Sequence, residues 1–165
     1  RTNSIRSKIE MPVLLTTKKI IKEWTDYNGH MNLSYYILIF DMGAEVILSK
    51  FKMGEHSAKT EKKSTMVVET HTTYNQEVKE GDEVDVFLSH FDHDNKRLHY
   101  KLEMYDKIKN TLSATTEVLS LYIDLSVRKV SEFEEEKKTI MNEFISKYKT
   151  QFKSDDLKFS NKLKK

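Results

Sequence analysis

The chain has 165 residues, 38% of them hydrophobic and 10% aromatic, so it can bury one hydrophobic core. Its 28 Lys and Arg nearly balance its 26 Asp and Glu, and a net charge of +2 does not favour a nucleic-acid partner. The absence of cysteine excludes disulfides and thiolate chemistry, and favours a cytoplasmic protein. Charged residues interrupt every apolar run, so no membrane span is predicted.

The first half of the chain predicts a strand, a loop and a long helix. Residues 13–24 are rich in β-branched side chains and predict a strand, and Gly29 marks the loop after it. From residue 33 to residue 53 the apolar side chains recur at helical spacing and leave only a narrow polar strip. A helix with so little polar surface is expected to be mostly buried. The polar strip consists of Asp41, Glu45, Ser49 and Lys52.

The ends of this helix have recognisable capping residues. Asn32 or Ser34 can accept a hydrogen bond from the first free backbone N–H groups. Gly54 stands where a left-handed residue would end the helix. The helix is therefore predicted to be a discrete element with a loop before it.

The second half predicts antiparallel strands and a terminal helix. Side chains alternate along 65–78, with Val67, Glu69, His71 and Thr73 expected on one face. Short polar turns separate the strands, which is typical of an antiparallel meander. The predicted strands are 65–78, 83–91, 97–105 and 112–124.

An amphipathic helix is expected between Phe133 and Tyr148, and the lysine-rich segment after it is predicted to be disordered. We therefore expect an α+β protein with one domain over residues 1–153 and a tail over 154–165. One buried helix needs a sheet to cover it. This element order predicts a hotdog fold, in which a five-stranded antiparallel sheet wraps around a long central helix.

The loop before the central helix is the strongest candidate for a functional site. Residues 24–32 (WTDYNGHMN) place Asp26 just before the helix, where free N–H groups and the helix dipole favour negative charge. Such a position can hold the oxyanion of an attacked carbonyl, with Asp26 as nucleophile or base. The alternative is structural, because Asp, Asn and Gly are also ordinary capping and turn residues.

The same stretch, DYNGHMN followed by Tyr35 and Tyr36, resembles the 4-hydroxybenzoyl-CoA thioesterase branch of the hotdog acyl-CoA thioesterases. The resemblance extends from about Val13 to Glu134. More narrowly, EWTDYNGHMN, NKRLH, MY and EVLSLYID are similar to the betainyl-CoA thioesterases of carnitine breakdown. Beyond about residue 149 the chain does not match the family.

This resemblance implies roles for several loop residues. Asp26 corresponds to the family's catalytic acid, and backbone N–H groups near Gly29 and Leu33 would polarise the thioester carbonyl. His30 and Asn32 occupy motif positions that would orient the acid, a water molecule or the acyl group. No cofactor is implied, because coenzyme A belongs to the substrate.

Further residues are candidates for substrate binding. Glu69 and His71 could reach the site across a subunit interface, or be an ordinary polar pair. A quaternary ammonium group favours an aromatic cage, and coenzyme A phosphates favour basic side chains. The cage candidates are Trp24, Tyr27, Tyr35 and Tyr36, and the phosphate candidates are Lys96, Arg97, Arg128 and Lys129.

The sequence thus predicts a thioester hydrolase that acts on a small acyl-CoA, with betainyl-CoA as the first candidate. The alternatives are other short, branched or aromatic acyl groups, or a module that binds acyl-CoA without catalysis. The open sheet edges predict a homodimer or homotetramer. The acids and histidines of residues 90–95 (HFDHDN) are scattered by strand alternation, so no metal site is predicted.

Overall fold

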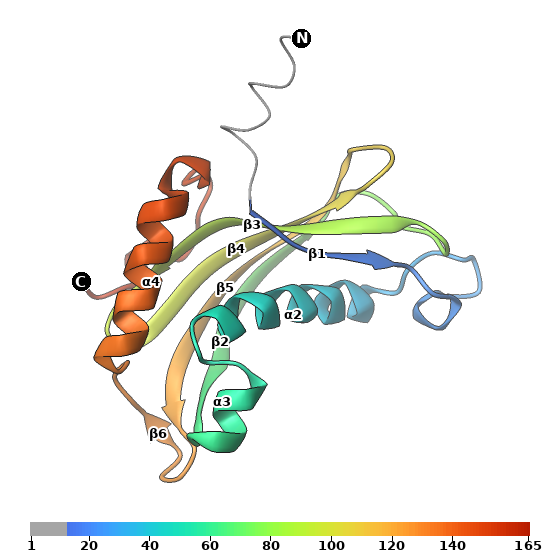
Figure 1. Cartoon of the computed structure of the whole chain (residues 1–165). Helices are drawn as coiled ribbons and strands as arrows, with labels where there is room; N and C mark the ends of the chain where they lie inside the picture. The colour runs from blue at the N-terminus through green and yellow to red at the C-terminus, as the bar shows by residue number, and fades with distance from the viewer. Residues whose placement is uncertain (1–12) are drawn as a thin grey trace.

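The computed structural model describes residues 13–165 and has the predicted α+β architecture (Figure 1). One antiparallel sheet arches over a long helix, α2, and a second long helix, α4, packs at the other end of the sheet. The strands are β1 (Val13–Lys19), β2 (Lys63–Tyr74), β3 (Glu83–His93), β4 (Arg97–Asp106), β5 (Leu112–Asp124) and β6 (Lys129–Val130). The α-helices are α2 (Leu33–Lys50), α3 (Glu55–Thr60) and α4 (Glu135–Tyr148).

The sheet has the order β1-β3-β4-β5-β2, and the short strand β6 pairs with β5. Each neighbouring pair is antiparallel. This arrangement of five long strands curled around α2 is the predicted hotdog fold. The outer edges of β1 and β2 have no partner strand among the described residues, which matters for assembly.

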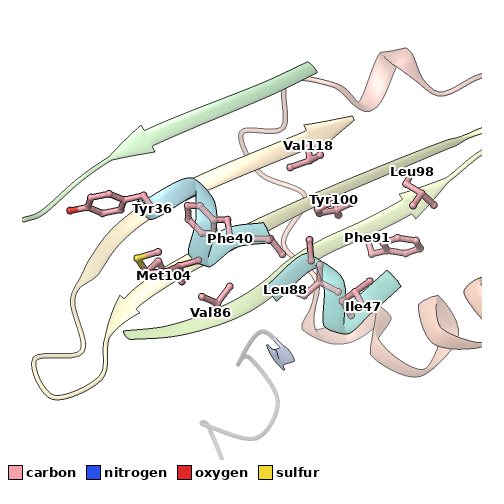
Figure 2. Close-up of a cluster of buried hydrophobic side chains, with 14 of the residues drawn as sticks. Tyr36, Phe40, Ile47, Val86, Leu88, Phe91, Leu98, Tyr100, Met104 and Val118 are labelled. Atoms are coloured by element: carbon pink, nitrogen blue, oxygen red, sulfur yellow. The ribbon is translucent and has the colours of Figure 1, made fainter. Parts of the chain in front are cut away.

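Helix α2 buries one stripe of side chains against the concave face of the sheet. Its buried residues recur every three or four positions, as expected for one face of a helix. Phe40 and Ile47 lie in one cluster with Val86, Leu88 and Tyr100 from the sheet (Figure 2). A Cβ atom at position 43 would come within 2.9 Å of Val86 Cγ1, so Gly43 permits the helix to approach β3 closely.

The prediction of a mostly buried helix is only partly right. Leu33 is 60% exposed, and Ile37 and Leu38 are each 38% exposed, so a second apolar face of α2 remains open. The helix also ends at Lys50, before the predicted limit at residue 53. The left-handed residue is Lys52, with φ of 58°, and Gly54 is instead the N-cap of α3, a helix that we did not predict.

The first strand is shorter than predicted. It ends at Lys19, and residues 22–24 form a 3₁₀ turn whose last residue, Trp24, packs against the core. Ile20 is buried and its backbone pairs with Asp82 and Gly81, so the chain leaves the strand at a fixed point. This turn brings the chain to the loop that precedes α2.

Helix α4 completes the core beyond the end of α2. Phe144 packs edge-on against Phe51, with ring centroids 5.2 Å apart, and Phe51 lies 4.8 Å from Phe91. Met141 is fully buried beside them. The predicted amphipathic character of this helix is confirmed.

The tail predicted to be disordered lies against the outer, convex face of the sheet. Backbone N–H groups of Lys158 and Phe159 donate to the buried Glu117 carboxylate at 2.7 to 2.9 Å. The Lys164 N–H donates to Asp94 at 2.8 Å, and Phe159 is only 5% exposed. The prediction failed because these partners come from distant strands and leave no periodic pattern in the tail itself.

Among the described residues, no helix is long and apolar enough to cross a membrane.

Candidate active site

The loop before α2 is closed by its own backbone. The Asp26 N–H donates to the His30 carbonyl at 2.9 Å, and the Gly29 N–H donates to the Asp26 carbonyl at 3.0 Å. Gly29 has a φ of 75°, a left-handed conformation that glycine adopts without strain. The Asn32 N–H donates to the Trp24 carbonyl at 3.0 Å, which fixes the loop against the start of the helix.

This loop holds the Asp26 carboxylate by one of its two oxygens. Asp26 Oδ1 accepts hydrogen bonds from the N–H groups of Asn28 at 2.8 Å and His30 at 3.2 Å. No group in residues 13–165 donates to the second oxygen, and the side chain is exposed to solvent. A carboxylate that is oriented but not saturated can attack a carbonyl or accept a proton.

Within residues 13–165, the first turn of α2 offers a free backbone donor beside this loop, the N–H of Leu33. Of the two predicted capping residues, Asn32 is the N-cap: its Oδ1 accepts from the Ser34 N–H at 3.1 Å, and its carbonyl accepts from the Tyr35 N–H. The Leu33 N–H has no acceptor in the described part of the chain. Gly29 N–H is already bonded to Asp26, so Leu33 is the better candidate of the two for polarising a carbonyl.

The side chain of His30 is directed to Glu77, with its Nε2 3.4 Å from Glu77 Oε2, and His30 contacts the Asp26 carboxylate through its backbone N–H. Its backbone forms an isolated bridge with Lys79, which ties the loop to the connection between β2 and β3. The side chains of His30 and Asn32 therefore both have local structural partners.

The four aromatic residues proposed as a cage do not converge within the chain. Trp24 stacks on Tyr35 with ring centroids 6.1 Å apart, whereas Tyr27 is 97% exposed. Tyr36 is buried in the core, where it packs edge-on against Tyr74. Only Trp24 and Tyr35 form a joint surface, and Tyr36 is a core residue.

Glu69 and His71 lie on the outer face of the sheet, away from α2. A bulge between Val67 and Glu69 shifts the alternation of β2, so Val67 faces α2 together with Thr70 instead of sharing a face with His71. Glu69 lies 4.0 Å from Lys162 of the tail. The single chain therefore does not bring Glu69 or His71 to the Asp26 loop.

The four basic candidates lie at one end of the sheet. Lys96 and Arg97 are at the turn between β3 and β4, and Arg128 and Lys129 follow β5 nearby. Arg97 also pairs with Asp94 at 3.1 Å. The Asp26 loop lies at the opposite end, because Met31 and Gly29 bond to residues between β2 and β3. In one chain these basic residues and Asp26 are thus far apart.

A cavity of about 220 Å³ lies between α2 and the sheet, next to the edge strand β2. Sequence reasoning missed it, because Asp41 was assigned only to a polar strip. The residues that line this cavity are Ile37, Phe40, Asp41, Ala44, Val67, Thr70, Tyr100, Leu102, Thr116 and Val118.

Within residues 13–165 no group of three or more metal-ligating acids, histidines or cysteines comes together.

Comparisons with known proteins agree with this fold. Residues 21–144 match the family model of the thioesterase-like superfamily. The chain is 30% identical over 128 residues to a betainyl-CoA thioesterase of Pseudomonas aeruginosa, covering 76% of this chain and 80% of the relative. It is also 30% identical over 119 residues to an L-carnitine dehydrogenase/betainyl-CoA thioesterase of Rhizobium meliloti, covering 72% of this chain but only 24% of that longer protein.

Solved structures share the architecture. A Staphylococcus aureus protein in complex with CoA has a TM-score of 0.76 and 26% identity, covering 94% of this chain and 96% of that one. A 1,4-dihydroxy-2-naphthoyl-CoA thioesterase from Synechocystis has a TM-score of 0.68 and 16% identity, covering 77% and 93%. The second likeness concerns the fold alone.

The chain therefore belongs to the thioesterase-like superfamily, whose match includes the Asp26 loop, the central helix and strands β2 to β6. It is a thioester hydrolase of the hotdog fold.

Proposed function

We propose that this protein hydrolyses a small acyl-CoA thioester, with betainyl-CoA as the first candidate. One observation carries the proposal: in the loop that precedes α2, one Asp26 carboxylate oxygen and the Leu33 N–H both have no hydrogen-bond partner among residues 13–165. The similarity to a betainyl-CoA thioesterase supports the choice of acyl group. Carnitine breakdown is the metabolic setting that this choice suggests.

In the proposed reaction, water is added across the thioester C–S bond. Asp26 either attacks the carbonyl carbon and forms an anhydride that water hydrolyses, or accepts a proton from an attacking water molecule. The carbonyl oxygen gains negative charge in either route, and the Leu33 N–H donates to it. The C–S bond then breaks, and the CoA sulfur leaves as a thiolate that takes up a proton.

The site is proposed to be completed by a second copy of the chain. The outer edge of β2 lacks a partner strand in the described residues, and its Met66, Val67 and Val68 are 52%, 49% and 46% exposed. Two such edges can pair antiparallel about a two-fold axis. This pairing reverses the partner, so the basic end of one sheet approaches the Asp26 loop of the other and can bind CoA phosphates.

Oligomeric state tests this assembly. Light scattering is expected to give a dimer for the wild type and a monomer for Val68→Lys, because a lysine on this edge opposes strand pairing. Val130→Lys is the matched control, since Val130 is similarly exposed, at 45%, on β6. A tetramer that Val68→Lys reduces to monomers would also agree with this assembly. A monomeric wild type would contradict the proposal that two subunits form the site together.

Activity is tested by thiol release from betainyl-, acetyl-, medium-chain and 4-hydroxybenzoyl-CoA. The chain has no cysteine, so a thiol reagent gives no protein background. A preference for betainyl-CoA of about 100-fold, or about 3 kcal/mol, is expected. Preference for another acyl group would support the thioesterase activity but contradict betainyl-CoA as the substrate. No release from any thioester would leave a module that binds acyl-CoA.

A further inference from the structure

Asp94, in the turn between β3 and β4, holds three basic residues around one point at the end of the sheet. Its side chain is only 2% exposed. One carboxylate oxygen accepts hydrogen bonds from the backbone N–H groups of Lys96 at 2.8 Å and Arg97 at 2.7 Å. The other accepts from Arg97 Nη1 at 3.1 Å and from the backbone N–H of Lys164, in the tail, at 2.8 Å. Every donor that reaches this carboxylate within residues 13–165 thus belongs to a basic residue.

The surrounding backbone keeps this arrangement in place. The Asp94 N–H donates to the Arg97 carbonyl at 3.1 Å, and the Tyr122 N–H of β5 donates to the Lys96 carbonyl at 2.8 Å. Burial alone would raise the pKa of Asp94, but the hydrogen bonds from Lys164 and from the turn outweigh burial and lower it. The basic side chains are therefore positioned before a ligand binds, which reduces the entropy lost on binding.

The three basic residues line one cavity of about 310 Å³. The ammonium groups of Lys96 and Lys164 have no ion-pair partner among residues 13–165, whereas the adjacent Lys165 pairs with Asp92. The Asp94 carboxylate already accepts four hydrogen bonds, so it has little left for a cation. Two ammonium groups and a guanidinium around one cavity favour an anion, and a phosphate group has enough acceptor oxygens for all of them. The other lining residues are Asn95 and Glu132.

We propose that this cavity binds a phosphate group of coenzyme A, and that Lys164 of the tail is a specificity residue for the CoA part of the substrate. This inference rests on the proposed thioesterase function. Residues 21–144 match the family model, so Lys164 lies outside the matched part of the chain. The tail would thus add a contact to the substrate that the matched domain does not contain.

The position of this cavity suits a phosphate group better than an acyl group. In coenzyme A the pantetheine arm separates the sulfur from the diphosphate and from the 3′-phosphate. In the proposed dimer, the basic end of one sheet lies toward the Asp26 loop of the other subunit. Thr65 of β2 pairs with Tyr122, whose N–H bonds to Lys96, so the turn lies two strands from the β2 edge, or about 10 Å. This separation leaves room for the arm between the thioester and the phosphate.

A thioester without phosphates tests the site independently of the chemistry. An acyl-CoA is compared with the N-acetylcysteamine thioester of the same acyl group, which ends before the diphosphate. Lys164→Ala should raise KM for the acyl-CoA about 5- to 10-fold and leave kcat nearly unchanged, because the phosphate contact is the same in the ground state and the transition state. The kcat/KM of the N-acetylcysteamine thioester should not change.

Two further variants control for charge and for the tail. Lys158→Ala removes the same charge from the same tail, but Lys158 Nζ pairs with Asp156 at 2.9 Å and does not line the cavity. This variant should keep the wild-type KM. Glu132→Gln removes an acid from the cavity wall, so KM for the acyl-CoA should fall about 2- to 5-fold. A purely structural role of Lys164 would not predict this opposite effect at Glu132.

The outcomes separate this inference from the proposed function. If the wild type hydrolyses the acyl-CoA but Lys164→Ala behaves like Lys158→Ala, the phosphate site is overturned and the thioesterase remains. An equal loss with the N-acetylcysteamine thioester also overturns it, because the variant would then have changed the catalytic site. If the wild type hydrolyses no thioester, the proposed function fails. Calorimetry with free CoA then decides: equal affinity of wild type and Lys164→Ala overturns the phosphate site, and weaker binding by the variant supports it.

Binding of 3′-dephospho-CoA and inorganic phosphate identifies the source of the phosphate group. If Lys164→Ala weakens binding of CoA but not of 3′-dephospho-CoA, the cavity holds the 3′-phosphate. If it weakens binding of both equally, the cavity holds the diphosphate, and either result supports the site. A loss that is measured only with inorganic phosphate would overturn CoA as the ligand of this cavity.

Discussion

Carboxylates on the two sides of the sheet differ in how many hydrogen bonds they accept. On the outer face, Glu117 is 1% exposed and accepts from His99 Nε2 at 2.7 Å and from two N–H groups of the tail. On the helix side, Asp26 uses one oxygen and Asp41 has no partner in the described chain. A saturated carboxylate stabilises the fold, whereas an unsaturated one is available for a substrate.

The largest expected effect is on Asp26. Asp26→Asn preserves the shape of the side chain and can still accept the N–H bonds of the loop, so the free energy of unfolding should change by less than about 1 kcal/mol. It removes the nucleophile or base, so kcat/KM should fall about 10³-fold or more. Thiol release and thermal unfolding measure the two effects. Full turnover by this variant would refute the catalytic role of Asp26.

Glu117→Gln should give the opposite result. The amide has only one acceptor oxygen for three groups and adds donors in a buried place, so stability should fall by about 3 kcal/mol. Chemical denaturation measures this loss, and Glu143→Gln is the exposed control. Substrate preference should be that of the wild type in the folded fraction. A catalytic defect without a stability loss would contradict the distinction between the two faces.

Removal of residues 155–165 should have a smaller effect than Glu117→Gln. Truncation loses the burial of Phe159, but it also opens Glu117 to water, which replaces the missing donors. We expect a loss of about 2 kcal/mol, or roughly 4 to 8 °C in Tm. An unchanged Tm would mean that the tail does not hold the outer face in solution.

The sequence predicted the fold better than the site. Strand alternation and the apolar pattern of α2 depend on local spacing, so the hotdog arrangement and the Asn32 cap could be inferred. The bulge after Val67 could not, and it moved Val67 away from the face shared by Glu69 and His71. Asp41 was hidden for a different reason, because only the curved sheet turns one position of a polar strip into the wall of a cavity.

The smallest effect concerns pH and His90, on the outer face. Burial, with a further contribution from His99, lowers the pKa of His90 to about 4. The unfolded chain binds a proton near pH 6.5, so between pH 6.5 and about 4 it binds more protons than the native state. Stability should therefore decrease as pH falls through this range, and His90→Gln should reduce the decrease by about 1 kcal/mol.

Titration of Glu117 should cause a second decrease in stability, at a lower pH than that of His90. Burial alone would raise its pKa, but the hydrogen bonds from Lys158, His99 and Phe159 outweigh burial and hold the pKa below its usual range. Its stabilisation is therefore present above the unfolded pKa and is lost only as pH falls through the lower native pKa. Denaturation curves from pH 7 to 3 should show a His90-dependent decrease first and a Glu117-dependent one below it. A single decrease that His90→Gln leaves unchanged would show that His90 is not the first group to titrate.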